Sequence, residues 1–243
     1  MPEGPECLLT VDFLNQHLQN QQITEWIFCG GRYTEIEPDG FFEFDGALPL
    51  TVESVKCKGK FIYFTLKDSN NKAFFIMHSL MMTGRWQNYC DDYCKWFVEV
   101  EGKTLWFRDP RNFATLIFTS SKDVLDEKLN SLGPDIMTRE FSLPLFRELI
   151  KRYKNRNITA FLMDQHVISG CGNYLKAEVL WDSYISPLRK VHTLTEREIE
   201  LLHESLRIVP RLSYNRKGVT LRDYANGDGE AGRYSSALNI YGV

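Results

Sequence analysis

The first residues of the chain could supply a nucleophile with a proton donor beside it. The sequence begins Met1-Pro2-Glu3, and removal of Met1 would leave the secondary amine of Pro2 as the chain terminus. An α-amino group titrates near ~8, so a neutral amine that attacks an electrophilic carbon and forms an iminium is within reach near neutral pH. The Glu3 carboxyl could move protons beside it. On these residues alone, an ordinary helix start without chemistry is the alternative.

A helix must hold this terminus in place. Pro5 suits a first helical turn because its missing N–H is not needed there, and Glu6 suits the positive end of the helix dipole. Apolar residues then recur at helical spacing, namely Cys7, Leu8, Val11, Leu14 and Leu18. The sequence therefore predicts a helix whose apolar face fixes the terminus against a core.

Downstream of this helix the hydrophobic pattern changes twice. Short apolar runs between turn residues predict strands over Ile23–Cys29, Thr51–Lys60, Phe61–Leu66, Lys72–His78, Trp96–Val100, Thr104–Phe107 and Ala114–Thr119. After Gly133-Pro134 the period becomes helical, over Leu143–Tyr153, Ile158–Asp164, Asn173–Trp181 and Thr195–Leu212. We expect an α+β protein: an N-terminal helix plus a two-sheet β-sandwich in residues 1–133, and a helical domain in residues 134–243.

Composition limits the class of protein. Of 243 residues, 43% are hydrophobic and 25% are charged, as in globular proteins that do not span a membrane. No apolar run approaches the ~20 residues of a membrane span, and the N-terminus lacks the features of a secretory signal. The six cysteines lack the paired spacing of a zinc site. We expect reduced thiols and an intracellular protein that is not secreted.

The charge is unevenly distributed along the chain. The net charge is −3, yet residues 1–138 carry 13 basic and 20 acidic side chains, whereas residues 139–243 carry 16 and 12. A protein can dock on phosphate through one basic face despite an acidic total. A nucleic-acid partner is therefore compatible with this composition.

A glycine turn in the second half could bind an anion. Gly170-Cys171-Gly172 precedes Asn173, where a helix is expected to begin. Exposed N–H groups at a helix start together with a glycine turn form an anion site. The alternative is a helical hairpin whose glycines only permit tight packing. Nearby basic residues favour the phosphate interpretation: Arg147, Lys151, Arg152, Lys154 and Arg156.

Taken together, Pro2-Glu3-Gly4-Pro5-Glu6 and Gly170-Cys171-Gly172-Asn173-Tyr174-Leu175 resemble the formamidopyrimidine-DNA glycosylase/endonuclease VIII family. The resemblance implies the family's order of helix, β-sandwich and helix–two-turn–helix domain. It implies a bifunctional DNA glycosylase and lyase of base excision repair that removes oxidised bases and cuts the strand by β,δ-elimination, without an organic cofactor. The alternative is a module of the same fold that binds damaged DNA without cutting, as a retained Met1 would produce.

The resemblance also assigns roles to single residues. Pro2 would attack the sugar C1′, and Glu3 would be the acid and base that helps to open the sugar. Lys60 would contact a phosphate near the lesion and assist catalysis, where the alternative is a solvated turn lysine, the interpretation given to Lys58. Asn173 would hold a phosphate, and Glu6 is grouped with the DNA-binding residues.

Three further residues match the positions that fill the gap left by an extruded base. Met82 matches the apolar wedge, and Arg111 and Phe113 match the loop that completes the trio. An apolar wedge suits a hole with stacked walls, and an arginine suits an orphaned base with unpaired edges. For Met82 alone, a core methionine is the alternative.

Two departures from the family pattern affect the expectations. The family's C-terminal zinc-finger hairpin is not expected in this chain, because Leu238–Gly242 resembles only its lead-in; zinc is implied only if a finger is missing from the sequence. The N-terminus resembles the endonuclease VIII branch, which favours oxidised pyrimidines. In contrast, residues 218–234 resemble the lesion-capping loop of the formamidopyrimidine branch. The expected partner is damaged DNA, as duplex, single strand or bubble, bound by a monomer in the nucleus or cytoplasm.

Overall fold

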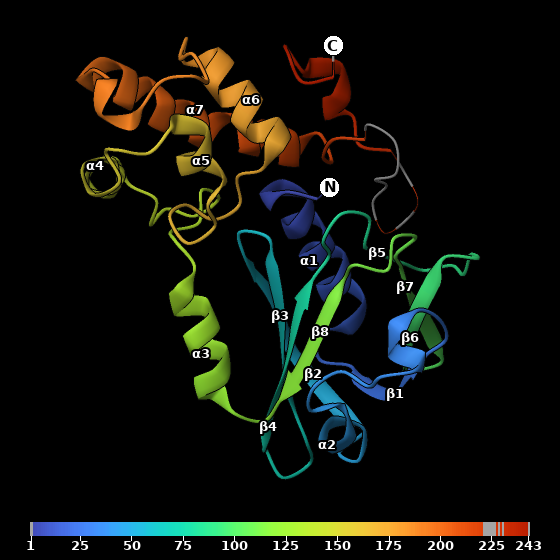
Figure 1. The fold of residues 1–243 in the computed structure, drawn as a ribbon. Helices are drawn as coiled ribbons and strands as arrows, with labels where there is room; N and C mark the ends of the chain where they lie inside the picture. The colour runs from blue at the N-terminus through green and yellow to red at the C-terminus, as the bar shows by residue number, and fades with distance from the viewer. Residues whose placement is uncertain (1, 221–226, 228, 230, 243) are drawn as a thin grey trace.

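A computed structural model describes residues 2–220, 227, 229 and 231–242. The helices are α1 (Gly4–Leu18), α2 (Phe41–Asp45), α3 (Lys122–Ser131), α4 (Leu143–Arg152), α5 (Ile158–Met163), α6 (Asn173–Asp182) and α7 (Glu196–Asn215). The strands are β1 (Gln22–Phe28), β2 (Leu50–Lys58), β3 (Phe61–Lys67), β4 (Ala73–Ser79), β5 (Arg85–Gln87), β6 (Cys94–Val100), β7 (Lys103–Arg108) and β8 (Thr115–Thr119). Figure 1 shows the sandwich below the helical part, with the start of α1 between them.

The strands form the predicted antiparallel β-sandwich. Their hydrogen-bonded order is β5-β7-β6-β1-β2-β3-β4-β8, and only two residue pairs, at Gln22 and Ile23, join β1 to β2. That joint separates two layers, whose aromatic rings meet in the core. The Trp26 and Phe118 rings lie 5.3 Å apart and the His78 and Trp96 rings 5.8 Å apart. The expected fold class of helix, two-sheet sandwich and helical part is confirmed.

Three elements were not predicted, and the clearest is α3. It packs beside β4 (Figure 1), where Leu125 joins Phe61, Phe75 and Met77 in a small apolar cluster. Leu125 is the one buried residue of this helix. Leu129 packs half-buried against the same cluster, and two apolar residues one turn apart are too few to show a helical period. The short strand β5 and the short helix α2 were missed for a related reason, since neither is long enough to show a period.

The helical part begins its helices where the sequence places capping residues. Ser142 caps α4, Asn157 caps α5, and Thr195 forms a capping box with Glu198 at α7. The structure has two large apolar cores, one formed by residues that precede Gly133 in the sequence and one by residues that follow it. After α7, the described residues form the 3-10 turn η3 (Tyr234–Ala237) and no β-hairpin.

The turn between β2 and β3 docks on the helical part. Gly59 has φ +61° there, and its N–H donates to the Asp135 Oδ2 atom at 2.8 Å. The second Asp135 oxygen accepts from the Met137 N–H at 2.9 Å, and the Gly4 N–H donates to the Gly170 carbonyl at 2.9 Å. The Asp135 side chain therefore holds the hairpin, and a backbone hydrogen bond joins the start of α1 to the glycine turn.

We predict that Gly59→Ala lowers the free energy of unfolding more than Gly102→Ala does. Both glycines have positive φ, where an L-residue costs roughly 1–2 kcal/mol. A Cβ on Gly59 would lie 2.5 Å from the Gly170 nitrogen, whereas a Cβ on Gly102 meets nothing within 4 Å. The forced displacement should add about 1–3 kcal/mol at Gly59 only. Denaturant unfolding of both variants measures the difference, and equal losses would contradict the docking contact.

Candidate active site at the chain terminus

The buried Glu3 carboxylate lies against the N-terminus of α6. Its Oε1 atom accepts from the Tyr174 N–H at 2.9 Å and its Oε2 atom from the Leu175 N–H at 3.2 Å. These are two of the free N–H groups with which a helix begins. The anion site predicted at this helix start is thus filled, at these two N–H groups, by a side chain from the other end of the sequence.

Gly172 allows Glu3 and Lys60 to approach the same point. A Cβ on Gly172 would lie 2.5 Å from the Lys60 Nζ atom and closer still to the Glu3 carboxylate. Both side chains therefore lie against Gly172, and no residue with a Cβ fits at this position without displacing them. The tight-packing alternative for the glycine turn is correct at this position, and the residues it packs against are the predicted catalytic ones.

Burial raises the pKa of Glu3 to about 7, the Lys60 ammonium opposes this rise, and the nearby Glu6 carboxyl adds to it. A substantial fraction of Glu3 therefore carries its proton near neutral pH. After it gives up the proton, the carboxylate is stabilised by the two α6 N–H groups and by Lys60. This is the arrangement that a general acid requires.

Glu6 does not face the outside of the protein as a DNA-binding residue would. Its buried carboxylate accepts from the Glu3 N–H at 2.9 Å, the Tyr174 hydroxyl at 3.1 Å and the Val219 N–H at 3.0 Å. The grouping of Glu6 with DNA contacts is corrected accordingly. Glu6 joins the start of α1 to α6 and to the segment after α7, so it positions Glu3. Nothing in the sequence indicated that Tyr174 or Val219 would form a hydrogen bond with Glu6.

Pro2 lines a cavity of about 250 Å³ between the β2–β3 hairpin, the end of α3 and the segment that follows α5. Lys60 and the turn residue Gln165 also line it. Lys58 lines the same cavity, but its Nζ atom donates to the Leu129 carbonyl at 2.8 Å, so it anchors α3 and is not a solvated turn lysine. Pro2 and Lys60 thus meet at one cavity, while Met1 lies outside the described residues.

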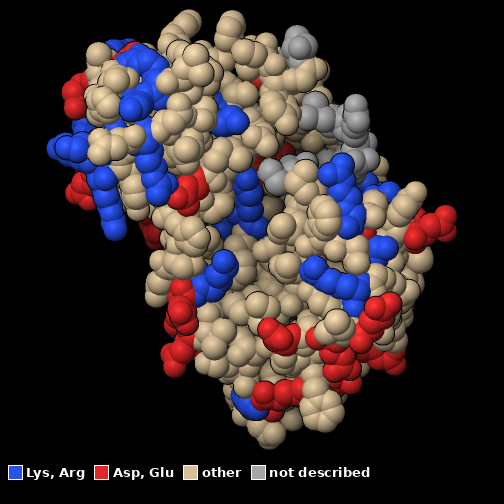
Figure 2. Space-filling model, in the orientation of Figure 1, with Lys and Arg blue, Asp and Glu red and all other residues tan. Residues whose placement is uncertain are grey.

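Asn173 is exposed at the first position of α6, and its Oδ1 atom accepts from the Lys176 Nζ atom at 3.0 Å. Part of the predicted basic segment is already paired with carboxylates. Arg147 pairs with Glu196 and Glu200, and Arg156 pairs with Asp164. Lys151, Arg152 and Lys154 are exposed. Figure 2 shows basic side chains over the helical part and on both sides of the central hollow, with acidic ones at the lower end of the sandwich.

The three predicted gap-filling residues lie on two neighbouring loops. Met82 is 37% exposed, Phe113 is 51% exposed, and Arg111 is also exposed. The core alternative for Met82 is therefore not supported by its burial. The Thr83 hydroxyl donates to Asp109 Oδ1 at 2.5 Å, and the Arg111 N–H donates to Thr83 Oγ1 at 3.4 Å. Thr83 and Asp109 tie the loops together, and sequence reasoning missed both, because their pairing spans 26 positions.

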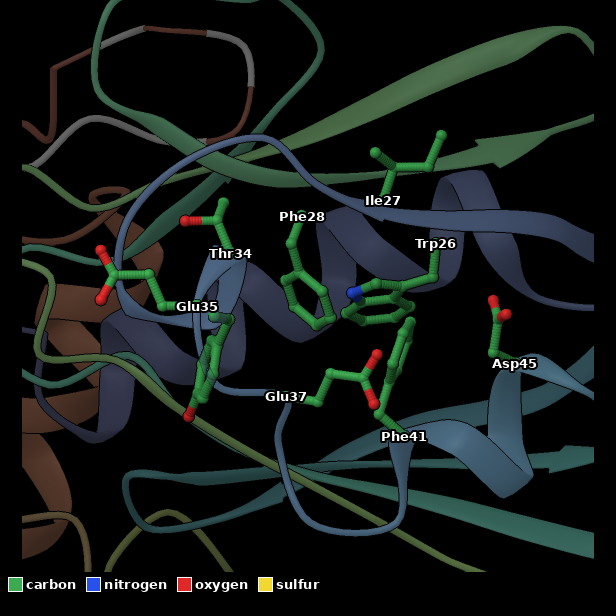
Figure 3. Close-up of a pocket in the computed structure, with 9 residues that line it drawn as sticks. Trp26, Ile27, Phe28, Thr34, Glu35, Glu37, Phe41 and Asp45 are labelled. Atoms are coloured by element: carbon green, nitrogen blue, oxygen red, sulfur yellow. The ribbon is translucent and has the colours of Figure 1, made fainter.

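A second hollow, of about 540 Å³, lies at β1, η1 (Arg32–Thr34) and α2. Figure 3 shows the rings of Trp26, Phe28 and Phe41 there, with the carboxylates of Glu35, Glu37 and Asp45 around them. Carboxylates repel phosphate, so this hollow is not a candidate DNA site.

Two other kinds of site were sought in the part of the chain that the structure describes. No group of three or more His, Cys, Asp or Glu residues there is arranged to hold a metal ion. Within the same residues, no helix combines the length and the apolar character needed to cross a membrane.

Comparison with known proteins places both parts of the chain. The sequence models of the formamidopyrimidine-DNA glycosylase N-terminal domain and H2TH domain match residues 1–116 and 132–224. A formamidopyrimidine-DNA glycosylase of Halalkalibacterium halodurans is 30% identical over 250 residues, which cover 100% of this chain and 89% of that protein.

Solved structures of formamidopyrimidine-DNA glycosylases have a similar fold over nearly the whole chain. The MutM (Fpg) protein of Thermus thermophilus has a TM-score of 0.85 at 28% identity, covering 99% of this chain and 87% of that one. The Lactococcus lactis Fpg in complex with DNA containing an abasic site has a TM-score of 0.84 at 26% identity, covering 99% and 88%.

The raised pKa of Glu3 predicts a pH-dependent stability. The unfolded carboxyl loses its proton near its ordinary pKa of 4.5, whereas the native carboxyl holds it up to about 7. The native state binds more protons in this window, so its stability falls as pH rises from about 4.5 to 7, by about 3 kcal/mol. Denaturant unfolding across this range should show the fall in wild type and a smaller fall in Glu3→Gln. Parallel pH curves for the two proteins would refute a raised pKa.

Proposed function

The chain belongs to the formamidopyrimidine-DNA glycosylase family, and we propose that it removes oxidised bases from DNA through a covalent Pro2 intermediate and then cuts the strand. DNA glycosylase activity on oxidised bases is the function that its relatives support. The observation that carries the finer proposal is the Glu3 carboxyl, which burial keeps partly protonated one residue from Pro2 and beside Lys60.

In the proposed reaction the Pro2 nitrogen forms a bond to the sugar C1′ atom. Glu3 protonates the ring oxygen as its bond to C1′ breaks, which opens the sugar. The base leaves with the electron pair of the glycosidic bond and takes up the proton that the amine loses, so the open sugar stays joined to Pro2 as an iminium. The cationic nitrogen acidifies the neighbouring C2′ proton, so a weak base suffices for β-elimination of one phosphate, followed by δ-elimination of the other. Lys60 is assigned to the phosphate near the lesion.

We assign residues 1–133 to catalysis and residues 134–243 to DNA binding. Asn173 is exposed at the start of α6, close in sequence to the Glu3 partners Tyr174 and Leu175, so a phosphate bound there would lie near the acid. Met82, Arg111 and Phe113 are assigned to the gap left by the extruded base. The proposed partner is damaged DNA, bound by a monomer wherever the cell keeps that DNA. The proposed steps use no cofactor.

The assignment of Pro2 as nucleophile is tested by trapping. Borohydride should reduce the iminium and crosslink the protein to DNA that contains an abasic site. One glycine added before Pro2 turns the nucleophilic amine into an amide and should abolish the crosslink. The mass of the intact protein shows whether Met1 has been removed. A crosslink that persists in the extended protein would assign the nucleophile to another residue, and intact binding without any crosslink would favour the non-cutting module.

The role of Glu3 is tested by separating the two chemical steps. Glu3→Gln keeps the shape of the side chain but removes the titrating carboxyl. Base excision should fall by about 10²–10⁴-fold, the usual contribution of a general acid. Strand cutting at a preformed abasic site should fall much less, because the base has already left. Single-turnover rates on both substrates give the comparison, and matching losses would reject a role specific to base removal.

The role of the gap-filling residues is tested by comparing excision from duplex DNA with excision from single-stranded DNA. Extruding a base from a duplex costs a few kcal/mol of stacking and pairing, and a wedge offsets part of this cost. Met82→Ala and Phe113→Ala should therefore slow excision strongly on duplex DNA and weakly on a single strand with the same lesion. Arg111→Ala should slow duplex excision and change the preference for the opposite base. Losses of the same factor in both contexts would mean that these residues do not fill a gap.

A further inference from the structure

We propose that the loop between β5 and β6, residues 88–93, forms a stacking platform for an unpaired base of single-stranded or bubble DNA. The proposal rests on the proposed function, because the platform would extend the DNA-binding surface beyond the gap-filling residues. It adds a DNA-binding site on a loop to which no role has been given above.

The platform consists of two exposed tyrosines. Tyr89 is 39% exposed and Tyr93 is 49% exposed. Both lie on the short connection between β5 and β6, away from the sandwich core. Stacking on aromatic side chains is the sequence-tolerant way in which proteins bind unpaired bases, because every base has a π-face.

An arginine contacts each tyrosine. The Arg85 Nη2 atom donates to the Tyr89 hydroxyl at 3.0 Å. The Arg108 guanidinium lies 4.7 Å from the centre of the Tyr93 ring, and its Nε atom pairs with Asp91 at 2.7 Å. The rings are thus held in place before any ligand binds, which reduces the ordering cost of binding.

The charge near the loop suits a phosphate backbone. Arg85 and Lys95 lie at the two strands that flank the loop, and Asp91 is already paired with Arg108. Asp92 adds an exposed carboxylate and opposes binding. Two aromatic rings with arginines beside them are the combination used by proteins that bind single strands.

The platform is continuous with the gap-filling loops. The Tyr93 carbonyl accepts from the Asp109 N–H at 3.0 Å, and Asp109 is the residue that ties Thr83 to the Arg111 loop. At the other end, a Cβ on Gly229 would lie 3.3 Å from the Tyr89 ring. The Tyr93 backbone therefore adjoins the segment that leads to Arg111, and a base stacked on Tyr93 would extend the DNA-binding surface from that loop.

Duplex DNA offers this loop only base edges and phosphates, whereas an unpaired base offers its whole face. The platform should therefore act on unpaired DNA, in contrast to the gap-filling residues, which act on duplex. The two surfaces together would let one protein process a lesion in either context.

The test compares binding of a short thymidine oligonucleotide with binding of an undamaged hairpin duplex, by fluorescence anisotropy. Tyr93→Ala and Tyr93→Leu should each weaken binding of the single strand about tenfold and leave duplex binding within about twofold, as expected for loss of one stacked base. Tyr93→Phe keeps the ring face and should bind like wild type. Tyr184→Ala removes a tyrosine that is 90% exposed at the far end of α6 and serves as the control.

The same preparations are then tested for excision of one lesion in duplex and in single-stranded DNA. Wild-type excision on duplex tests the proposed function independently of the platform. Excision from the single strand should fall in Tyr93→Ala while duplex excision is kept. Unchanged binding of the single strand by Tyr93→Ala, or equal losses on both DNA forms, would overturn the platform. So would loss of binding in Tyr93→Phe.

Discussion

The two hydrogen bonds from the start of α6 to the Glu3 carboxylate are the contacts on which the rest of the site depends. They join residue 3 to residues 174 and 175, and so they join the sandwich side of the molecule to the helical side. The carboxylate that acts as the proposed acid is also the group that satisfies two N–H groups of the helix. The proposed acid therefore reaches this environment only when both parts of the chain have folded and docked.

Several neighbours permit this contact. The Glu6 carboxylate accepts a hydrogen bond from the Glu3 N–H, which fixes the backbone of Glu3. The same carboxylate accepts from the Tyr174 hydroxyl and the Val219 N–H. Gly59 and Gly172 lack the side chains that would push the hairpin and Lys60 away. Burial raises the pKa of both carboxyls, so the site carries a cost in stability that apolar packing elsewhere must offset.

The sequence predicted the long elements, and it failed where a partner lies far along the chain. The strands other than β5 and the helices α4 to α7 showed a clear period, whereas the roles of Pro2, Glu3 and Lys60 were assigned from motifs and stay predictions. The ion pairs of Arg147 with Glu196 and Glu200 span about 50 positions. The sequence therefore did not show that part of the basic segment is already paired with carboxylates. The role of Glu6 was misjudged for the same reason, because all but one of its partners come from the helical part. Helix α3 was missed because only two of its residues, Leu125 and Leu129, pack against the apolar cluster, too few to show a helical period.

The hydrogen bond between Thr83 and Asp109 has a consequence for how DNA is searched. It joins the loop of Met82 to the loop of Arg111 and Phe113, so a displacement of one loop strains the contact that holds the other. In the proposed function, Met82 enters the lesion strand while Arg111 meets the complementary strand. With these roles, insertion at one strand is mechanically linked to insertion at the other, so a variant that breaks the Thr83–Asp109 contact would uncouple them.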